Sequence, residues 1–206
     1  LKIPVVDEHY YQQPEWFVSN QYRYDGYNRS QGQVYLGEYA SWGNKLRNAL
    51  AEALYMTSLE RNGDVVRMAS YAPLFAKKGF TQWKTDMIFF DNHSFYRTPN
   101  YYVQQLFATH AGDHYLDRII GKDSRDSLVA GSSVMDSRSG DVILKLVNTG
   151  DKEEKINLDL SRLRRVQPEA SRYELSGNAD QENSFENPSA LAPVQSVIEL
   201  PGRKFS

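Results

Sequence analysis

The 206-residue sequence contains no cysteine. This absence excludes disulfide bonds, zinc sites built on thiolates and cysteine nucleophiles, and it leaves the redox compartment open. An excess of charge of one sign is also missing, because 24 basic side chains stand against 26 acidic ones. Without basic clusters, nothing indicates a nucleic acid or an anionic membrane surface as a partner. No apolar run approaches the roughly 20 residues of a membrane-spanning helix, so no membrane partner is expected.

Aromatic residues, by contrast, are plentiful and make up 13% of the chain, with 14 tyrosines among them. In the first half they cluster, as in "HYYQQPEWF", "YLGEYASW" and "FYRTPNYY". A tyrosine has an apolar ring and a polar tip, which suits the edge of a core and equally a surface that stacks on sugar rings. Composition leaves both interpretations open, and core packing is the commoner one.

Strand-like and helical patterns alternate over the first 112 residues. The runs "IPVVDEHYY", "QVYLGEYA" and "VVRMASYAPLF" are typical of strands, while residues 44–62 and "TPNYYVQQLFATHAG" are typical of helices. We expect the helix over 44–62 to begin at a capping asparagine, Asn44, and to bury one face. The alternation predicts parallel βα units, and therefore an α/β part.

The pattern changes after about Gly121. Runs such as "SLVAGSSVMD", "GDVILKLVNTG" and "QSVIELPG" are short, rich in β-forming residues, and separated by Gly, Asn and Asp turns. They predict an all-β part over 128–206, folded as an antiparallel β-sandwich of jelly-roll-like type. Residues 113–127 are the natural linker between it and residues 1–112. The sequence ends where a closing strand would be expected, so we expect the sandwich to be truncated.

Polar residues stand at the predicted strand ends. If the βα units belong to a (β/α)8 barrel, the chemistry lies at this end of the strands, because the βα loops build that face. Glu38 closes the second strand, and His9 and Tyr11 close the first, so an imidazole and a phenol could orient the carboxylate. Two plainer interpretations stand beside this one. Glu38 could complement the dipole of the following helix, and His9 could be a core histidine whose ring nitrogens are hydrogen-bonded within the protein.

The segments "VVDEHYY", "YDGYNRSQGQVYLGEYASW", "ALAEALYMTSLERNGDVVRMASYAPLFA", "QWKTDMIFFDN" and "TPNYYVQQLF" carry a resemblance. In this order they resemble the α-L-arabinofuranosidases of glycoside hydrolase family 51, over roughly residues 4–110. The β-rich remainder is similar to that family's C-terminal sandwich by position and pattern. The resemblance implies that residues 1–112 are the C-terminal part of a (β/α)8 barrel, and that the enzyme is a retaining, exo-acting glycosidase.

By this resemblance Glu38 corresponds to the catalytic nucleophile, which releases terminal α-L-arabinofuranosyl residues from arabinose-containing oligo- or polysaccharides. His9 and Tyr11 match a His-x-Tyr that contacts the nucleophile and the sugar. Trp83 and Asp86 fall in the loop after the eighth strand, where the family has further substrate-binding residues. No group of His, Asp and Glu has the spacing of metal ligands, so no metal and no cofactor is expected. An extracellular or periplasmic location is favoured, although the sequence does not fix it.

One part of the family's machinery has no counterpart in the sequence. A retaining glycosidase needs a second carboxyl group as acid/base, and no Asn-Glu strand end supplies it. We therefore expect the acid/base in a missing N-terminal barrel half, a 206-residue chain that is inactive by itself, and exposed sheet edges that favour association with that half or with another copy. The alternative is a non-catalytic carbohydrate-binding or scaffold module that keeps the fold without the chemistry.

Overall fold

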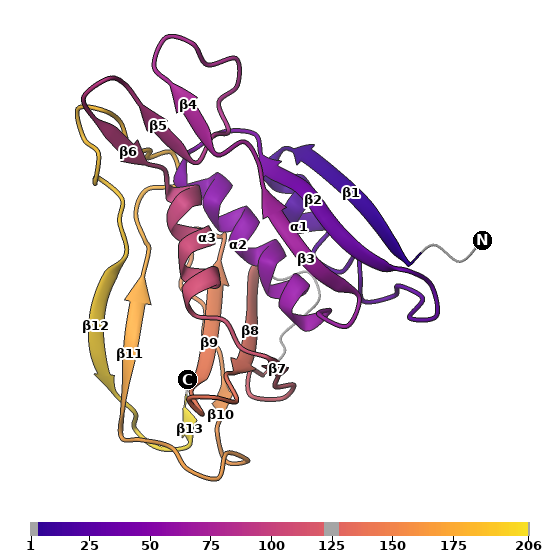
Figure 1. Cartoon of the computed structure of the whole chain (residues 1–206). Helices are drawn as coiled ribbons and strands as arrows, with labels where there is room; N and C mark the ends of the chain where they lie inside the picture. The colour runs from indigo at the N-terminus through magenta and orange to yellow at the C-terminus, as the bar shows by residue number, and fades with distance from the viewer. Residues whose placement is uncertain (1–3, 122–127, 206) are drawn as a thin grey trace.

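A computed structural model describes residues 4–121 and 128–205 of the chain. Its N-terminal part is a parallel three-stranded sheet in the order β1-β2-β3, covered on one face by helices (Figure 1). The strands are β1 (Val5–Gln12), β2 (Gln33–Ser41) and β3 (Val66–Tyr71), and the helices are α1 (Pro14–Ser19), α2 (Leu46–Arg61) and α3 (Pro99–Thr109). The predicted alternation of parallel strands and helices is confirmed. Within the described residues these strands form an open sheet rather than a closed barrel.

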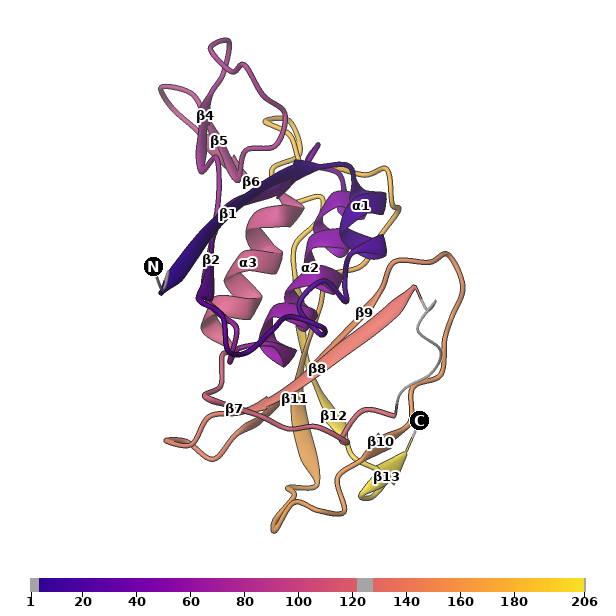
Figure 2. The same ribbon diagram turned by 90° about the vertical axis from the view of Figure 1, so that its right-hand side faces the viewer.

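The helix α2 lies between two layers, and the prediction that it buries one face was wrong. Toward the parallel sheet, Ala51 and Tyr55 join a core with Leu36 and other apolar side chains. Toward α3 and the C-terminal strands, Ala49 and Leu54 pack with further buried residues (Figure 2). A helix covered on both sides buries polar positions as well, which the single apolar stripe in the sequence does not reveal.

The start of α2 also differs from the prediction. The N-cap is Lys45, and the Asn48 side chain accepts a hydrogen bond from the Lys45 backbone N–H at 3.2 Å. Asn44 does not cap the helix; its side-chain amide instead donates to the Asp86 carbonyl at 2.8 Å and to Asn100 Oδ1 at 3.2 Å. It therefore ties the turn before α2 to the loop ahead of β5 and to the first turn of α3.

A second small sheet follows β3, in the order β4-β5-β6. The run that was predicted as one strand, residues 65–75, ends at Tyr71 and resumes only as β4. The strands of this sheet are β4 (Phe75–Lys77), β5 (Ile88–Phe90) and β6 (Phe95–Arg97). It projects beyond the carboxyl ends of the parallel strands, at the top of Figure 1.

The C-terminal part contains only strands within the described residues, and this confirms the predicted all-β class. Its strands pair antiparallel as β7-β8-β9, β11-β12 and β10-β13. They are β7 (His114–Tyr115), β8 (Val129–Met135), β9 (Val142–Asn148), β10 (Leu158–Asp159), β11 (Glu169–Glu174), β12 (Val194–Glu199) and β13 (Lys204–Phe205). In the predicted linker 113–127, β7 pairs with β8, and residues 122–127 lie outside the described part.

A polar contact joins the two parts at the C-terminal end of α2. Glu60, near the end of α2, accepts hydrogen bonds from Ser132 Oγ on β8 and from Lys145 Nζ on β9. The ammonium group of Lys145 also lies 4.8 Å from the ring centre of Phe107 on α3. Because the side chains of Lys145 and Glu60 are only 10% and 18% exposed, removal of either partner would leave a largely desolvated charge.

Candidate active site

Glu38 lies on the open face of the parallel sheet because of a bulge in β2. Val34 and Leu36 point to the helices and are fully buried, so strict alternation would also place Glu38 there. The register shifts by one residue: Glu8 pairs with Leu36, but His9 pairs with Glu38, and Gly37 is left between them. After the bulge Tyr39 occupies the helix side, and the Glu38 side chain is 46% exposed.

Tyr11 and His9 both approach the Glu38 carboxylate from β1. The Tyr11 hydroxyl donates a 2.7 Å hydrogen bond to Oε2 of Glu38, and Nδ1 of His9 lies 3.8 Å from the same oxygen. Partial burial, together with the bond to Glu38, raises the pKa of Tyr11 far above its usual range, so the phenol remains a neutral donor. Oε1 of Glu38 accepts no hydrogen bond from the described residues. One carboxylate oxygen is therefore held, and the other remains free to react.

His9 is itself held by a second carboxylate, which the sequence reasoning had not selected. Nε2 of His9 lies 3.2 Å from Oδ2 of Asp7, two residues earlier on the same face of β1. The neighbouring residue Glu8 faces the helix side, where it accepts hydrogen bonds from Tyr24 and Arg23. Alternation along β1 could have identified Asp7, because it shares its parity with His9 and Tyr11.

Two indole rings extend this site. Trp83 lies 5.1 Å from the Tyr11 ring and stacks on Trp42, with 5.1 Å between centroids and 14° between planes. The Trp42 indole N–H donates to the Tyr11 carbonyl at 2.8 Å, which fixes the platform to β1. Both tryptophans are about two-fifths exposed, an unusual state for so large an apolar group. Trp42 was part of the quoted motif but had not been selected; its signal was its position, four residues after Glu38.

Asp86 is placed apart from these side chains. It is 3% exposed, Oδ2 has no hydrogen-bond partner among the described residues, and burial raises the pKa of its carboxyl group. Its carbonyl holds Asn44, as described above. The structure thus brings together Glu38, Tyr11, His9 and Trp83, whereas the Asp86 side chain is buried and makes no hydrogen bond to any of them.

Gly37 leaves room for the Asp7–His9 pair. A Cβ atom built at position 37 would lie 2.1 Å from Oδ1 of Asp7 and 2.8 Å from Nε2 of His9, closer than such contacts ever come. Both neighbours are exposed enough to move, so a methyl group here would push the pair away rather than unfold the sheet. Gly37 is therefore a steric requirement of the site.

The described residues contain no group of three or more His, Cys, Asp or Glu side chains able to hold a metal ion. In the same residues, no helix has both the length and the apolar character needed to cross a membrane.

A free carboxylate at the end of a parallel strand, flanked by a phenol, an imidazole and stacked indoles, defines a candidate carbohydrate-processing site. Residues 37–206 match the family model described as "Alpha-L-arabinofuranosidase C-terminal domain". The chain belongs to the α-L-arabinofuranosidases of glycoside hydrolase family 51, within their C-terminal portion. The resemblance found in the sequence is thereby confirmed.

Relatives and solved structures agree with this assignment. The chain is 33% identical over 204 residues to α-L-arabinofuranosidase 1 of Arabidopsis thaliana, covering 94% of this chain and 30% of that protein. It is 51% identical over 111 residues to an extracellular exo-α-L-arabinofuranosidase of Streptomyces chartreusis, covering 54% of this chain and 14% of that protein. The chain thus spans less than a third of the length of these relatives.

The arabinose-bound α-L-arabinofuranosidase MgGH51 superposes with a TM-score of 0.92 at 30% identity, covering 98% of this chain and 34% of that one. An α-L-arabinofuranosidase from Thermotoga maritima, solved with arabinose, superposes with a TM-score of 0.77 at 16% identity, over 98% of this chain and 50% of that one. At this lower identity the second likeness concerns the fold alone.

Proposed function

We propose that the chain is the nucleophile-bearing part of a retaining, exo-acting α-L-arabinofuranosidase. The observation that carries the proposal is the state of Glu38: Oε2 is held by Tyr11, while Oε1, on the open face of the sheet, accepts no hydrogen bond from residues 4–121 and 128–205. The names of the relatives supply the sugar, a terminal α-L-arabinofuranosyl residue of an arabinose-containing oligo- or polysaccharide.

The reaction proceeds in two balanced steps. Oε1 of Glu38 attacks the anomeric carbon, the glycosidic C–O bond breaks, and the leaving oxygen takes a proton from an acid/base carboxyl group. Water then attacks the anomeric carbon and gives a proton to the acid/base carboxylate, while the bond from that carbon to Oε1 breaks; this frees Glu38 and releases arabinose with its anomeric configuration retained. We propose that the acid/base lies in a part of the polypeptide outside this chain. Residues 1–206 alone would then lack significant activity on natural arabinosides.

Each neighbour of Glu38 has a definite task in this scheme. Tyr11 keeps Oε2 oriented and remains a neutral donor, so it adds no charge when the ester forms. His9, held by Asp7, presents its second ring nitrogen to the same oxygen. The stacked pair of Trp42 and Trp83 supplies apolar faces for sugar C–H groups. A non-catalytic binding module would favour an aromatic platform remote from Glu38, but this platform contacts Tyr11 directly.

The function is tested on the full-length protein with 4-nitrophenyl α-L-arabinofuranoside. We expect hydrolysis, an initial product with retained anomeric configuration by proton NMR, and covalent labelling of Glu38 by a cyclophellitol-type arabinofuranose trap, located by peptide mass spectrometry. Labelling of a different carboxylate would remove Glu38 from the nucleophile's role. Initial release of the inverted anomer would contradict the two-step mechanism.

A further prediction concerns Gly37. We expect Gly37→Ala to lower kcat on the same aryl substrate by about ten-fold, because the methyl group displaces Asp7 and with it His9. Its matched control is Gly26→Ala, since a Cβ at position 26 would meet no atom within 4 Å. The double variant Asp7→Ala/Gly37→Ala distinguishes displacement of the Asp7 side chain from any other effect of the new methyl group on activity. If the pair acts through Asp7, adding Gly37→Ala to Asp7→Ala costs less than it does in the wild type.

A further inference from the structure

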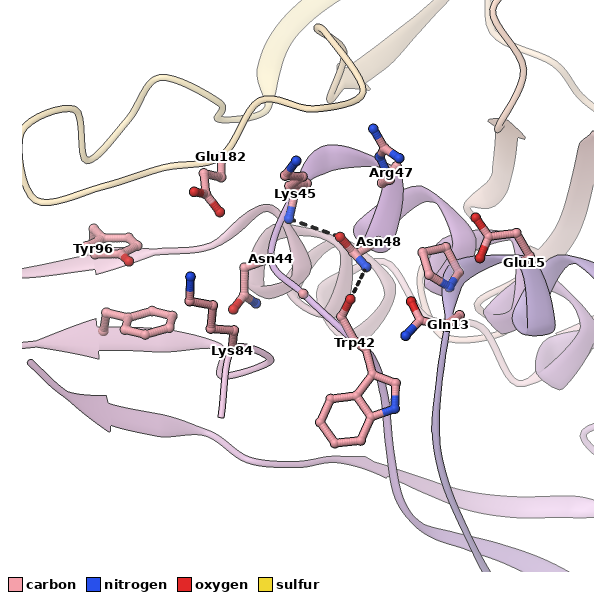
Figure 3. A pocket seen from close by; sticks show the side chains of 13 residues that line it. Gln13, Glu15, Trp42, Asn44, Lys45, Arg47, Asn48, Lys84, Tyr96 and Glu182 are labelled. Carbon is pink, nitrogen blue, oxygen red and sulfur yellow. Dashed lines mark hydrogen bonds between the residues drawn. The ribbon is translucent and has the colours of Figure 1, made fainter. Parts of the chain in front are cut away.

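A hollow of about 480 Å³ lies beside the aromatic platform, between the first turn of α2, the sheet β4-β5-β6 and a loop of the C-terminal part (Figure 3). Its size is within the range of small-molecule sites in proteins. Figure 3 shows Lys84, Tyr96 and Glu182 on one side of it, and Gln13 and Glu15 on the other. Glu182 is far from the others in sequence, so the folded sandwich part completes this hollow.

The loop that carries Glu182 is firmly attached. Next to it, Asn183 is 3% exposed, and its amide donates to the carbonyls of Arg97 and Leu191, each at 2.8 Å. Leu191 N–H donates back to Asn183 Oδ1 at 2.7 Å. Phe185 packs edge-on against Tyr96, with ring centroids 5.0 Å apart. These anchors hold Glu182 at the rim of the hollow against β6.

The same loop also covers the start of α2. The backbone N–H of Leu46 donates to the Gln181 carbonyl at 2.9 Å, and that of Arg47 donates to the Ala179 carbonyl at 3.0 Å. Asp180 binds the side chains of Lys45 and Arg47. The helix amides and their nearby cations are therefore already satisfied by the loop, which leaves little attraction for an anion at this helix end.

The lining has the mixture of groups that recognises a neutral sugar. Phe89 and Tyr96, whose rings stack in parallel 5.1 Å apart with 6° between planes, contribute apolar ring atoms to the lining. The ammonium group of Lys84 and the carboxylate of Glu182 provide a donor and an acceptor for hydroxyl groups. The lining as a whole has three basic and two acidic side chains, so its net charge is small: Lys45, Arg47, Lys84, Glu15 and Glu182. Burial and the negative charge of Glu182 and its neighbours raise the pKa of Tyr96 to about 12, so its hydroxyl stays neutral.

The hollow shares one side chain, Trp42, with the aromatic platform beside Glu38. Trp42 lines it and also stacks on Trp83, which contacts Tyr11. Along the chain, Trp83 and Lys84 are adjacent, so one loop contributes to the platform and to the hollow. A saccharide that reaches Glu38 can therefore extend past the two indoles into this space.

We propose that this hollow binds the sugar residues on the leaving-group side of the scissile bond, with Lys84 and Glu182 as specificity-determining residues. The inference rests on the proposed function, whose substrate it refines: an oligosaccharide with at least two sugars beyond the terminal arabinose is held by the sandwich part as well as by the α/β part. The loop around Glu182 is then a substrate-binding element and not only a structural one.

The test compares two substrates of the full-length protein, α-1,5-linked arabinotriose and 4-nitrophenyl α-L-arabinofuranoside. For the double variant Lys84→Ala/Glu182→Gln we expect kcat/KM on arabinotriose to fall by about ten-fold through KM, because hydrogen bonds to charged groups are lost. On the aryl substrate, which is too short to reach the hollow, kcat/KM should change by less than about two-fold. The control Lys77→Ala/Glu169→Gln makes the same charge changes outside the lining and should leave both substrates unaffected.

Three other results have distinct meanings. A wild-type protein without activity on the aryl substrate would refute the proposed function. Activity on it, with arabinotriose kinetics of the double variant equal to those of the control, would show that the hollow binds no sugar. An equal loss on both substrates would mean that Lys84 and Glu182 act on the fold or on Glu38, and it would also overturn the inference.

Discussion

Replacement of Glu38 by alanine in the full-length protein is expected to lower kcat for an aryl α-L-arabinofuranoside by roughly 10⁴-fold or more. The substitution removes the atom that bonds to the anomeric carbon, and neither Tyr11 nor His9 can replace it. The fold should be unaffected, because the Glu38 side chain is nearly half exposed and packs little apolar surface. The thermal unfolding midpoint of the variant should therefore match that of the wild type.

A rescue experiment separates the loss of a nucleophile from other damage. Sodium azide can enter the space that Glu38 vacates and attack the sugar from the same face, since Tyr11 and the indole platform stay in place. The product is then an arabinofuranosyl azide of inverted configuration, identifiable by NMR. Glu38→Gln, which keeps the size of the side chain, should be equally inactive but not rescued. Retention of substantial wild-type turnover by Glu38→Ala would assign the nucleophile elsewhere.

The second large effect concerns stability and pH, and it arises at Glu52 on α2. This side chain is fully buried, with Oε1 accepting the Ser41 N–H at 2.7 Å and Oε2 unpartnered among the described residues. Burial raises the pKa of Glu52 from 4.5 to about 8, although the hydrogen bond from the Ser41 N–H acts in the opposite direction. In the folded protein Glu52 is therefore neutral over a pH range in which it is ionised in the unfolded chain.

The sign of the effect follows from the raised pKa. Below about pH 4.5 both states hold the proton, and the stability associated with Glu52 is fully present. Between about pH 4.5 and 8 only the unfolded chain releases the Glu52 proton, so the free energy of unfolding declines as the pH rises. Above about pH 8 the folded protein releases the proton as well, and the decline ends. Glu52→Gln cannot ionise. Because one pKa unit corresponds to about 1.4 kcal/mol, we expect Glu52→Gln to become more stable relative to the wild type by roughly 5 kcal/mol between pH 4.5 and 8, in addition to a pH-independent difference between the amide and the acid.

Urea unfolding of the full-length protein at a series of pH values measures this difference. At each pH the free energy of unfolding of the wild type is subtracted from that of Glu52→Gln. The informative quantity is how this difference changes with pH. Glu169→Gln is the control, because it makes the same substitution at an exposed position on β11 rather than a buried one. A difference that stays constant from pH 4.5 to 8 would show that Glu52 is ionised in the folded protein.

The sequence by itself determined the local pattern and much of the candidate site. Alternation along residues 5–12 separates His9 and Tyr11 from Glu8, and the structure places them on opposite faces of β1. The apolar period and the family motifs located α2 to within a few residues and put Glu38 near a strand end, whereas the short helix α1 was not predicted. These features depend on neighbours in the chain, which is why a linear pattern records them.

Only the tertiary structure decided which way Glu38 points and what lies around it. Strict alternation from Val34 would have turned Glu38 toward the helices; the bulge at Gly37 reverses this, and a bulge is set by pairing with another strand. The burial of Glu52 likewise depends on the packing of α2 against β2, whose Ser41 N–H donates to Oε1 of Glu52. Lys84 and Glu182 meet at one hollow although about a hundred residues separate them. Contacts of this kind arise from packing between distant segments, and the local periodicity of a sequence carries no record of them.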